Sequence, residues 1–186
     1  MLTAYKNVVK KDHSLSTFGF GILGRLPLAM NTVGLVFLIS SIRNSFALAG
    51  VASACYTLAG AFVGPRIGKL ADVKGTRKVL IPITVLNAIA ITAILTIGVH
   101  HTPALLVSAA LAGATFPNFG SYTRTRWSRS LTDDRELGAA LSLESVLDET
   151  AFVVGPALAG FLFAWHGSRS PLIGAMIFLL IAGFGL

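Results

Sequence analysis

Charged residues are scarce in this 186-residue sequence: they make up 12% of it, about half of the share that is usual in soluble proteins. Hydrophobic residues make up 54% before the 19 glycines are counted. A soluble domain of this length buries roughly 70% of its unfolded surface, and this composition leaves too little polar surface to cover the rest. The sequence therefore predicts a protein that is surrounded by lipid.

Cysteine is nearly absent as well. The single cysteine, Cys55, lies in an apolar run, which excludes an intramolecular disulfide and any zinc site of the Cys/His type. The sequence also lacks a glycine-rich phosphate loop, a Ser/His/Asp constellation and a cluster of metal-ligating residues. We therefore expect no enzymatic activity, no metal ion and no cofactor.

Long apolar stretches fill most of the chain. About 20 helical residues cross a bilayer, and six stretches approach or exceed this length: about Ser16–Ser40, Phe46–Gly64, Val79–Val99, Pro103–Tyr122, Gly138–Ala164 and Pro171–Leu186. We predict an all-α membrane protein with a polar tail, residues 1–15, and a domain of six transmembrane helices, residues 16–186. Because the sixth stretch has 16 residues and no basic tail follows it, we expect a truncated chain or the first half of a longer one.

The cations fall almost entirely on one side of the predicted membrane. Twelve of the 15 Lys and Arg residues lie in the tail or in the connections after the second and fourth spans, whereas only Arg43 and Arg169 lie on the other side. Cytoplasmic loops carry such an excess of cations. We therefore expect a cytoplasmic N-terminus and a location in the plasma membrane. The net charge of +7 follows from this topology and does not indicate nucleic acid binding.

Two short segments recur about 90 residues apart in the sequence. Residues 61–65, AFVGP, are followed by residues 151–156, AFVVGP, and Gly75-Thr76-Arg77 by Gly167-Ser168-Arg169. Three spans separate the copies, which therefore cross the membrane in opposite directions. This pattern is typical of inverted repeats, and it predicts that the six spans are built as three plus three.

The connection after the second span carries the most specific motif. Residues 68–80, GKLADVKGTRKVL, resemble the signature of the major facilitator superfamily at Gly68, Leu70, Asp72, Gly75, Arg77 and Leu80. Val73 and Thr76 depart from it, because the family usually has Arg at both positions. The resemblance implies the N-terminal six-helix bundle of such a transporter. It also implies a loop that latches one transport state against the other half of the protein, formed here by Gly68, Leu70, Asp72, Gly75, Arg77 and Lys78.

The fifth span contains a second, partial resemblance. Gly155, Pro156 and Gly160 resemble the Gly-Pro signature of drug-exporting members, but Ser142, Ala151 and Ala159 stand where that signature has glycine. Small residues at such spacing also let helices pack closely. The resemblance therefore favours export over import only slightly.

Ionisable residues inside the predicted spans are the main candidates for function, because a charge at the bilayer centre costs roughly 3 kcal/mol unless it is paired or hydrated. Arg25, Glu144 and Asp148 lie at similar depths, about 12, 9 and 15 Å from the cytoplasmic side at 1.5 Å per residue. Glu144 and Asp148 share a helix face, whereas Glu149, the fourth candidate for the solute or proton path, points about 100° away. Either Arg25 and one acid line the solute path, with a carboxylate that carries a proton, or they form a static buried pair.

Uncharged polar residues supply weaker candidates. Asn31, Asn118 and Tyr122 lie within spans, where they either bind the solute or satisfy neighbouring polar groups. The arginine that many proton-coupled members carry in the fourth span cannot be placed here, because Ala109 stands at that position. Trp127 and Trp165 have the positions of membrane-interface anchors.

These features lead to one main functional hypothesis. The chain is expected to be the N-terminal half of a secondary active transporter that moves a small organic solute by alternating access, is driven by protons and favours efflux. Its partners are then the solute, protons, the lipid bilayer and a C-terminal six-span half. The alternative is a non-transporting six-span assembly or interaction subunit, in which the buried charges only fix helix register. A half-size transporter that dimerises is a third, weaker reading.

Overall fold

The structure, a computed structural model, describes residues 14–185. Most of the predicted tail, residues 1–15, and Leu186 therefore lie outside the described residues. All secondary structure in residues 14–185 is helical, as the sequence predicts. The helices are α2 (Ser14–Arg43), α3 (Phe46–Lys74), α4 (Thr76–Ala93) with a terminal π-helical turn η1 (Ile94–Gly98), α5 (Thr102–Ala114), α6 (Phe119–Ser130), α7 (Asp134–His166) and α8 (Ser170–Gly185).

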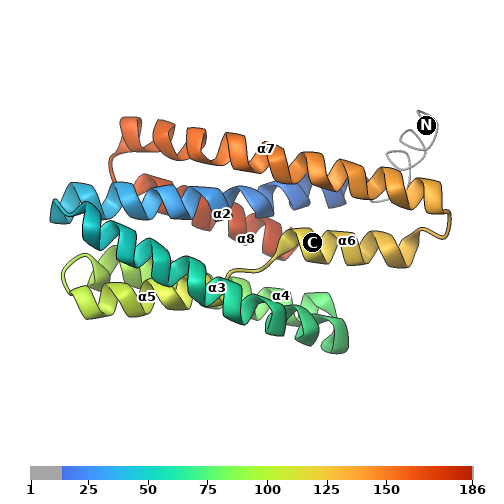
Figure 1. The fold of residues 1–186 in the computed structure, drawn as a ribbon, viewed down its shortest axis with the longest axis horizontal. Helices are drawn as coiled ribbons and strands as arrows, with labels where there is room; N and C mark the ends of the chain where they lie inside the picture. Colours follow the sequence, from blue (N-terminus) through green and yellow to red (C-terminus); the bar gives the residue numbers. More distant parts are fainter. Residues whose placement is uncertain (1–13, 186) are drawn as a thin grey trace.

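Within residues 14–185, five helical segments are long and apolar enough to cross a bilayer: Ser16–Arg43, Phe46–Lys74, Thr76–Gly98, Thr102–Ser130 and Asp134–His166. The sixth, α8, has 16 residues and is thus about 24 Å long at 1.5 Å per residue. Successive segments alternate in direction along the bundle (Figure 1). One end of the bundle therefore gathers the start of α2, the α3–α4 turn and the α6–α7 turn.

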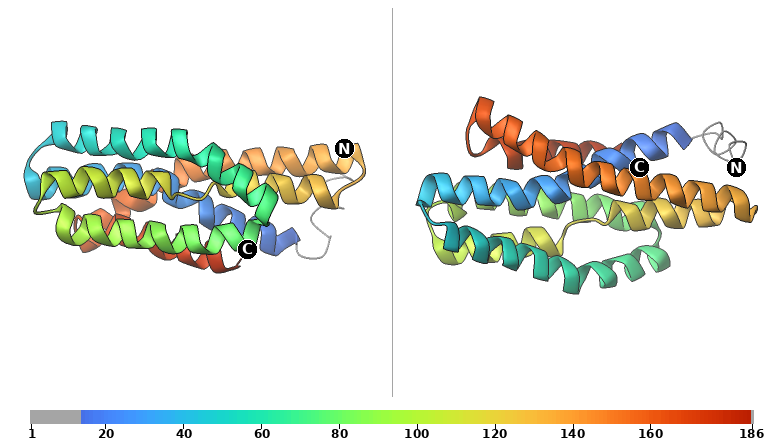
Figure 2. Two further views of the ribbon diagram at one scale, coloured as in Figure 1. Left: turned by 90° about the horizontal axis from the view of Figure 1, so that it is seen from below. Right: turned by 45° about the horizontal axis from the view of Figure 1, so that its top comes forward.

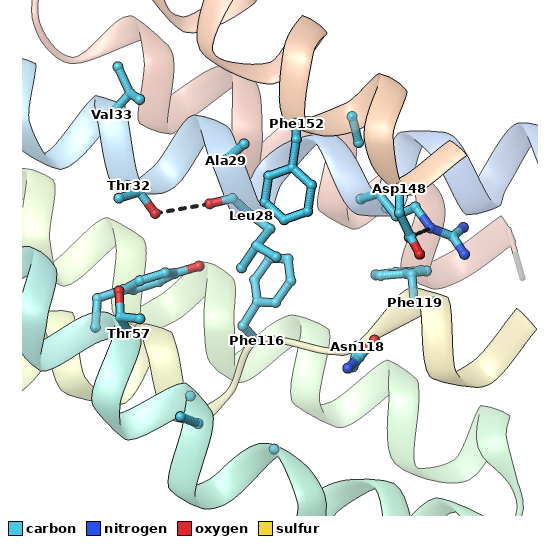
Figure 3. Close-up of a pocket in the computed structure, with 18 of the residues that line it drawn as sticks. Leu28, Ala29, Thr32, Val33, Thr57, Phe116, Asn118, Phe119, Asp148 and Phe152 are labelled. Atoms are coloured by element: carbon cyan, nitrogen blue, oxygen red, sulfur yellow. Dashed lines mark hydrogen bonds and ion pairs between the residues drawn. The ribbon is translucent and has the colours of Figure 1, made fainter. Parts of the chain in front are cut away.

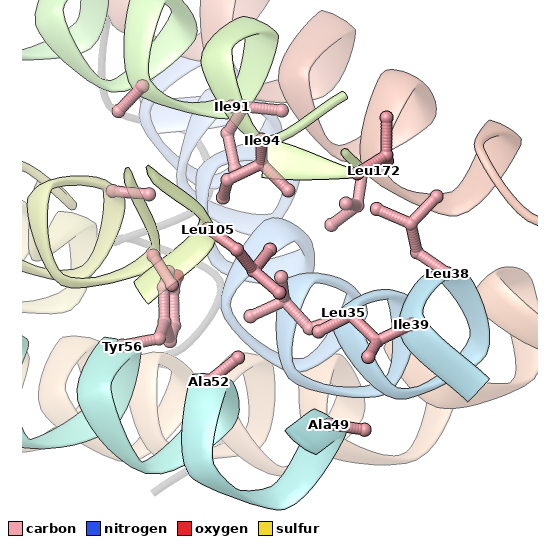
Figure 4. Packing of buried hydrophobic residues seen from close by; sticks show 14 residues of the cluster. Leu35, Leu38, Ile39, Ala49, Ala52, Tyr56, Ile91, Ile94, Leu105 and Leu172 are labelled. Carbon is pink, nitrogen blue, oxygen red and sulfur yellow. The ribbon is translucent and has the colours of Figure 1, made fainter. Parts of the chain in front are cut away.

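Helix α2 is the centre of the bundle, since it packs against α8, α7, α3 and α6. Helices α3, α4 and α5 form one side of it, while α7 and α8 lie on the other (Figures 1 and 2). Leu35, Leu38 and Ile39 of α2 are buried in the largest apolar cluster, together with side chains of α3, α4, α5 and α8 (Figure 4). This cluster holds the end of the bundle opposite the start of α2.

The motif after the second span is helical rather than a loop. Gly68, Leu70 and Asp72 belong to the last turns of α3, and Arg77 and Lys78 to the first turn of α4. Only the residue between the helices makes the reversal: Gly75 has φ 93°, which glycine adopts at little cost. The predicted span ends at Gly64, where hydropathy falls, whereas α3 continues through the charged residues to Lys74.

The fourth span is broken, which the sequence analysis did not predict. It is divided into α5 and α6 by residues 115–118. Pro117 has no N–H to continue the helical ladder, and the Phe116 N–H instead bonds the Gly113 carbonyl at 3.1 Å. Asn118 then starts α6 as its N-cap, its side chain accepting from Ser121 N at 3.1 Å. The carbonyl of Ala112, at the end of α5, accepts from the Asn87 side chain at 2.6 Å.

The two copies of the predicted repeat share some geometry. Helices α3 and α7 run in opposite directions (Figure 1). Each ends at a glycine of positive φ, Gly75 at 93° and Gly167 at 82°. These correspondences agree with an inverted repeat, but they involve two helices of six, and the three-plus-three construction stays a prediction.

Candidate functional site

Arg25 is the centre of a buried charged cluster. It lies on α2 and is 7% exposed. Its Nε donates to Asp148 Oδ1 at 2.6 Å, and its Nη2 donates to Glu144 Oε2 and, at 3.0 Å, to Thr123 Oγ1. One guanidinium therefore contacts two carboxylates of α7, those of Glu144 and Asp148, which lie one helical turn apart.

Glu144 is fully enclosed within the cluster, with 0% of its surface exposed. Besides Arg25, it accepts hydrogen bonds from Thr123 Oγ1 at 2.6 Å and from Trp127 Nε1 at 2.7 Å. Both donors come from α6. A buried carboxylate is tolerated only when it is paired and hydrogen-bonded, and Glu144 has a donor on each oxygen.

Asp148 differs from Glu144 because 29% of its side chain is exposed. Its second oxygen, Oδ2, accepts from Nη2 of Arg124 on α6 at 2.5 Å, and the Arg124 side chain is 43% exposed. Two arginines thus balance two carboxylates, and the four side chains tie α2, α6 and α7 together. We call Arg25, Arg124, Glu144 and Asp148 the charged cluster.

A cavity of about 590 Å³ borders the charged cluster and is bounded by α2, α3, α6, α7 and the α5–α6 connection. Its walls are mostly apolar, with Leu28, Phe116 and Phe152 near the middle (Figure 3). Asp148 and Asn118 lie at one end, and Thr32 and Thr57 at the other (Figure 3). Such a mostly apolar pocket with a few polar groups suits an organic ligand. Asp148 joins the cavity to the cluster.

The other predicted site residues have different surroundings. Asn118 lines the cavity while it caps α6. Asn31 is buried and donates to the Tyr56 hydroxyl at 3.3 Å, and its Oδ1 has no hydrogen-bond partner among the described residues. Tyr122 is buried in an apolar cluster of α3, α4, α6 and α8. Glu149 is exposed, which agrees with its predicted direction on α7, away from Glu144 and Asp148.

The motif residues and the small residues of α7 lie outside the charged cluster. Oδ1 of Asp72 lies 3.9 Å from Nη2 of Arg129 on α6, and both side chains are exposed. A Cβ on Gly155 would lie 2.9 Å from the Ala29 Cβ, so Gly155 sets the close approach of α7 to α2. Pro156 lines the cavity. Gly160 has open space around it, and its role in packing is therefore not visible in this bundle.

Three side chains of α6 that bind the two carboxylates were not expected from the sequence. Trp127 was expected at the membrane interface, but it is 4% exposed and bonds Glu144. Thr123 and Arg124 were assigned to a loop or left aside, because the fourth span was expected to end at Tyr122. Thr123 and Trp127 are four residues apart. If the fourth span had been extended beyond Tyr122, this spacing would have placed both side chains on one helix face. Trp165 is 73% exposed at the other end of the bundle.

No group of three or more His, Cys, Asp or Glu side chains within residues 14–185 is arranged to hold a metal ion. Asp148 and Asn118 present polar groups to the cavity, and Asp148 is shared between two arginines. The cluster otherwise holds three helices together.

Comparison with known proteins identifies the family. The chain is 30% identical over 166 residues to Multidrug resistance protein 1 of Bacillus subtilis (strain 168), and the alignment covers 87% of this chain and 42% of that protein. The chain thus spans less than half of the length of this relative. No solved structure gives a significant match. The profile of the Major Facilitator Superfamily matches residues 15–186, and the chain therefore belongs to this family of multi-pass membrane transporters.

Proposed function

We propose that this chain is the N-terminal half of a secondary active transporter that moves a small organic solute by alternating access. The observation that carries this proposal is the contact between a buried charged cluster and an apolar cavity, through the partly exposed side chain of Asp148. A purely structural ion pair has no need of an adjoining cavity. A solute path needs both a space and a group that responds to its occupant.

The lining of the cavity favours an aromatic or otherwise amphiphilic solute. Phe116, Phe119 and Phe152 contribute rings to its wall, and polar groups are concentrated at its ends. The name of the Bacillus relative indicates multidrug resistance, and the partial Gly-Pro motif at Gly155 and Pro156 points the same way. These features support export as the direction of transport.

Proton coupling is the proposed driving force. Asp148 is the carboxylate that reaches the cavity, so a proton arriving there meets it directly. Arg25 and Arg124 bind the ionised form of Asp148, and a proton or a solute competes with them. Through this competition, the binding of a proton or a solute at Asp148 changes the ion pairs that hold α2, α6 and α7 together. A coupled transporter requires such a dependence of helix packing on what is bound.

The exposed faces of the bundle support a second half and a defined orientation. Phe62 on α3 and Phe152 on α7 are 72% and 58% exposed, and both helices border the cavity. We infer that a C-terminal six-span half covers them, with the motif residues from Gly68 to Lys78 latching it in one state. The cations of the α3–α4 and α6–α7 turns lie at the end of the bundle where α2 starts, which supports a cytoplasmic N-terminus in the plasma membrane.

The test is a proton-flux assay on the complete protein, encoded by the full reading frame, in sealed vesicles. The panel contains amphiphilic aromatic dyes that are cationic, such as ethidium, neutral or anionic. We expect at least one of these dyes to cross the membrane in one direction while protons cross it in the other. Vesicles treated with a protonophore are the control, because they keep the protein but lose the gradient. If no member of a broad panel of amphiphiles and metabolites moves with protons, the proposal is wrong, and the non-transporting subunit becomes the better hypothesis.

A further inference from the structure

The two carboxylates of the charged cluster have unequal surroundings, although they are one turn apart on α7. Both oxygens of Glu144 accept hydrogen bonds in a fully enclosed site: Oε1 from Trp127, Oε2 from Arg25 and Thr123. Asp148 accepts only from the two arginines and is open to the cavity. The difference suggests different roles.

We propose that Glu144 is a positioning residue that stays ionised and fixes Arg25, and that Asp148 alone changes partners and takes up the proton. This inference rests on the proposed transport function and deepens it. It departs from the sequence-based hypothesis, which treated the two acids as equivalent.

The contacts of Glu144 disfavour its protonation. A proton on Oε2 would face the donors of Arg25 and Thr123, and a proton on Oε1 would face the indole N–H of Trp127. Protonation would also leave the Arg25 guanidinium without its enclosed counter-charge, and an uncompensated buried charge is strongly unfavourable. Glu144 is therefore suited to remain an anion throughout the cycle.

The slot around Arg25 shows that its guanidinium is held in one orientation. A Cβ on Gly21 would lie 2.8 Å from Nη1, and a Cβ on Gly120 would lie 3.3 Å from Nη2. The two glycines of α2 and α6 thus leave just enough room for the guanidinium. Glu144 and Thr123 bind its Nη2, and this places Nε against Asp148.

The charges that face Asp148 allow it to change state without disturbing the interior. Arg25 approaches from α2 and Arg124 from α6. On α7 itself the nearest acids are Glu144 and the exposed Glu149, while Asp134 and Glu136 lie in the first turn of this helix. Helix α8 carries no charged residue, and Tyr56 of α3 is the titratable group across the cavity. When a proton binds Asp148 Oδ2, Arg124 must leave this oxygen, and its half-exposed side chain can be solvated. Arg25 stays neutralised by Glu144.

Trp127 offers a reporter for Glu144, since its Nε1 donates to this carboxylate. The experiment uses the complete protein with every tryptophan except Trp127 replaced by phenylalanine, including Trp165→Phe. On acidification we expect no shift of the Trp127 emission maximum, while the infrared difference spectrum gains a protonated-carboxyl band. Because exposed acids of the protein also bind protons, the band of Asp148 is the part of the parent spectrum that Asp148→Asn lacks, and Glu144→Gln should keep that part. Glu144→Gln should also shift the Trp127 emission, which shows that the reporter responds to its partner.

Two results would overturn the inference: a Trp127 emission that shifts on acidification, or a protonated-carboxyl absorption that is the same in Asp148→Asn as in the parent protein. The emission of the parent protein and the spectrum of Asp148→Asn do not require the Glu144 variant to fold. Neither needs a solute. A protein that shows the expected spectra but no proton-linked flux would contradict the proposed function and leave the assignment of the two carboxylates intact.

Discussion

The Nε atom of Arg25 lies 2.6 Å from Oδ1 of Asp148, although the two residues are 123 positions apart in the chain. This ion pair joins the first span to the fifth at the edge of the cavity. It places Asp148, the more exposed of the two carboxylates in the charged cluster, at the wall of the cavity in which we propose that the solute and the proton bind. Removing either charge therefore changes both the packing of α2 on α7 and the chemistry of the cavity wall.

Asp148→Asn should abolish gradient-driven transport by the complete protein in reconstituted vesicles while the protein still inserts. The amide cannot take up and release a proton, and it accepts more weakly from the two arginines. The matched control is Glu149→Gln, which removes the same charge from the next residue, an exposed one, and should transport normally. Normal transport by Asp148→Asn would exclude the role proposed for this residue.

The proposed orientation can be tested by cysteine labelling of intact cells. In a Cys55→Ser background with other cysteines removed, His100→Cys should react with an impermeant thiol reagent from outside, and Lys74→Cys should react only after lysis. Both positions are exposed, and they lie at opposite ends of the bundle. The reverse pattern would show that the N-terminus is outside, because the α3–α4 turn and the start of α2 share one end.

Sequence reasoning reached the helical class and the pairing of Arg25 with the acids, because both depend on patterns along single helices. Apolar length predicts a span, and Glu144 and Asp148 share a face by their spacing of four. The depth of Arg25 then follows from the rise per residue. None of these steps needs knowledge of how the helices pack.

The parts that sequence reasoning missed depend on contacts between helices. The break before Asn118 arises because Pro117 interrupts the ladder while Asn87 of another helix binds a freed carbonyl. Four other prolines, including Pro65 and Pro156, lie inside unbroken helices, so proline alone does not predict a break. Trp127 likewise contacts Glu144 only because α6 continues the fourth span. The sequence did not predict this continuation, because α6 contains several arginines and is not apolar.

Asn87→Ala should destabilise the protein, because it leaves the Ala112 carbonyl at the end of α5 without its donor. An unsatisfied buried polar group costs about 1–3 kcal/mol, so the midpoint of thermal unfolding in detergent should fall. Thr150→Ala is the control: its hydroxyl donates to Val146 of its own helix and is exposed, and its loss should have little effect. Equal midpoints for the two variants would show that Asn87 does not support the break.

Gly113→Ala should be more damaging than any other glycine substitution on the faces that α3 and α5 share. A Cβ on Gly113 would lie 1.8 Å from the carbonyl oxygen of Tyr56, and a backbone atom cannot turn aside as a side chain can. The two helices must separate, which costs roughly 1–3 kcal/mol or more in a packed interior and moves Tyr56, a residue of the cavity wall. Unfolding should therefore occur at a lower temperature, and ligand-dependent stabilisation should weaken with it. Gly50→Ala is the matched control on α3, because nothing lies within 4 Å of its Cβ position and alanine favours the helix by up to about 1 kcal/mol. If Gly113→Ala were as stable as Gly50→Ala, the close packing of α3 on α5 would be wrong.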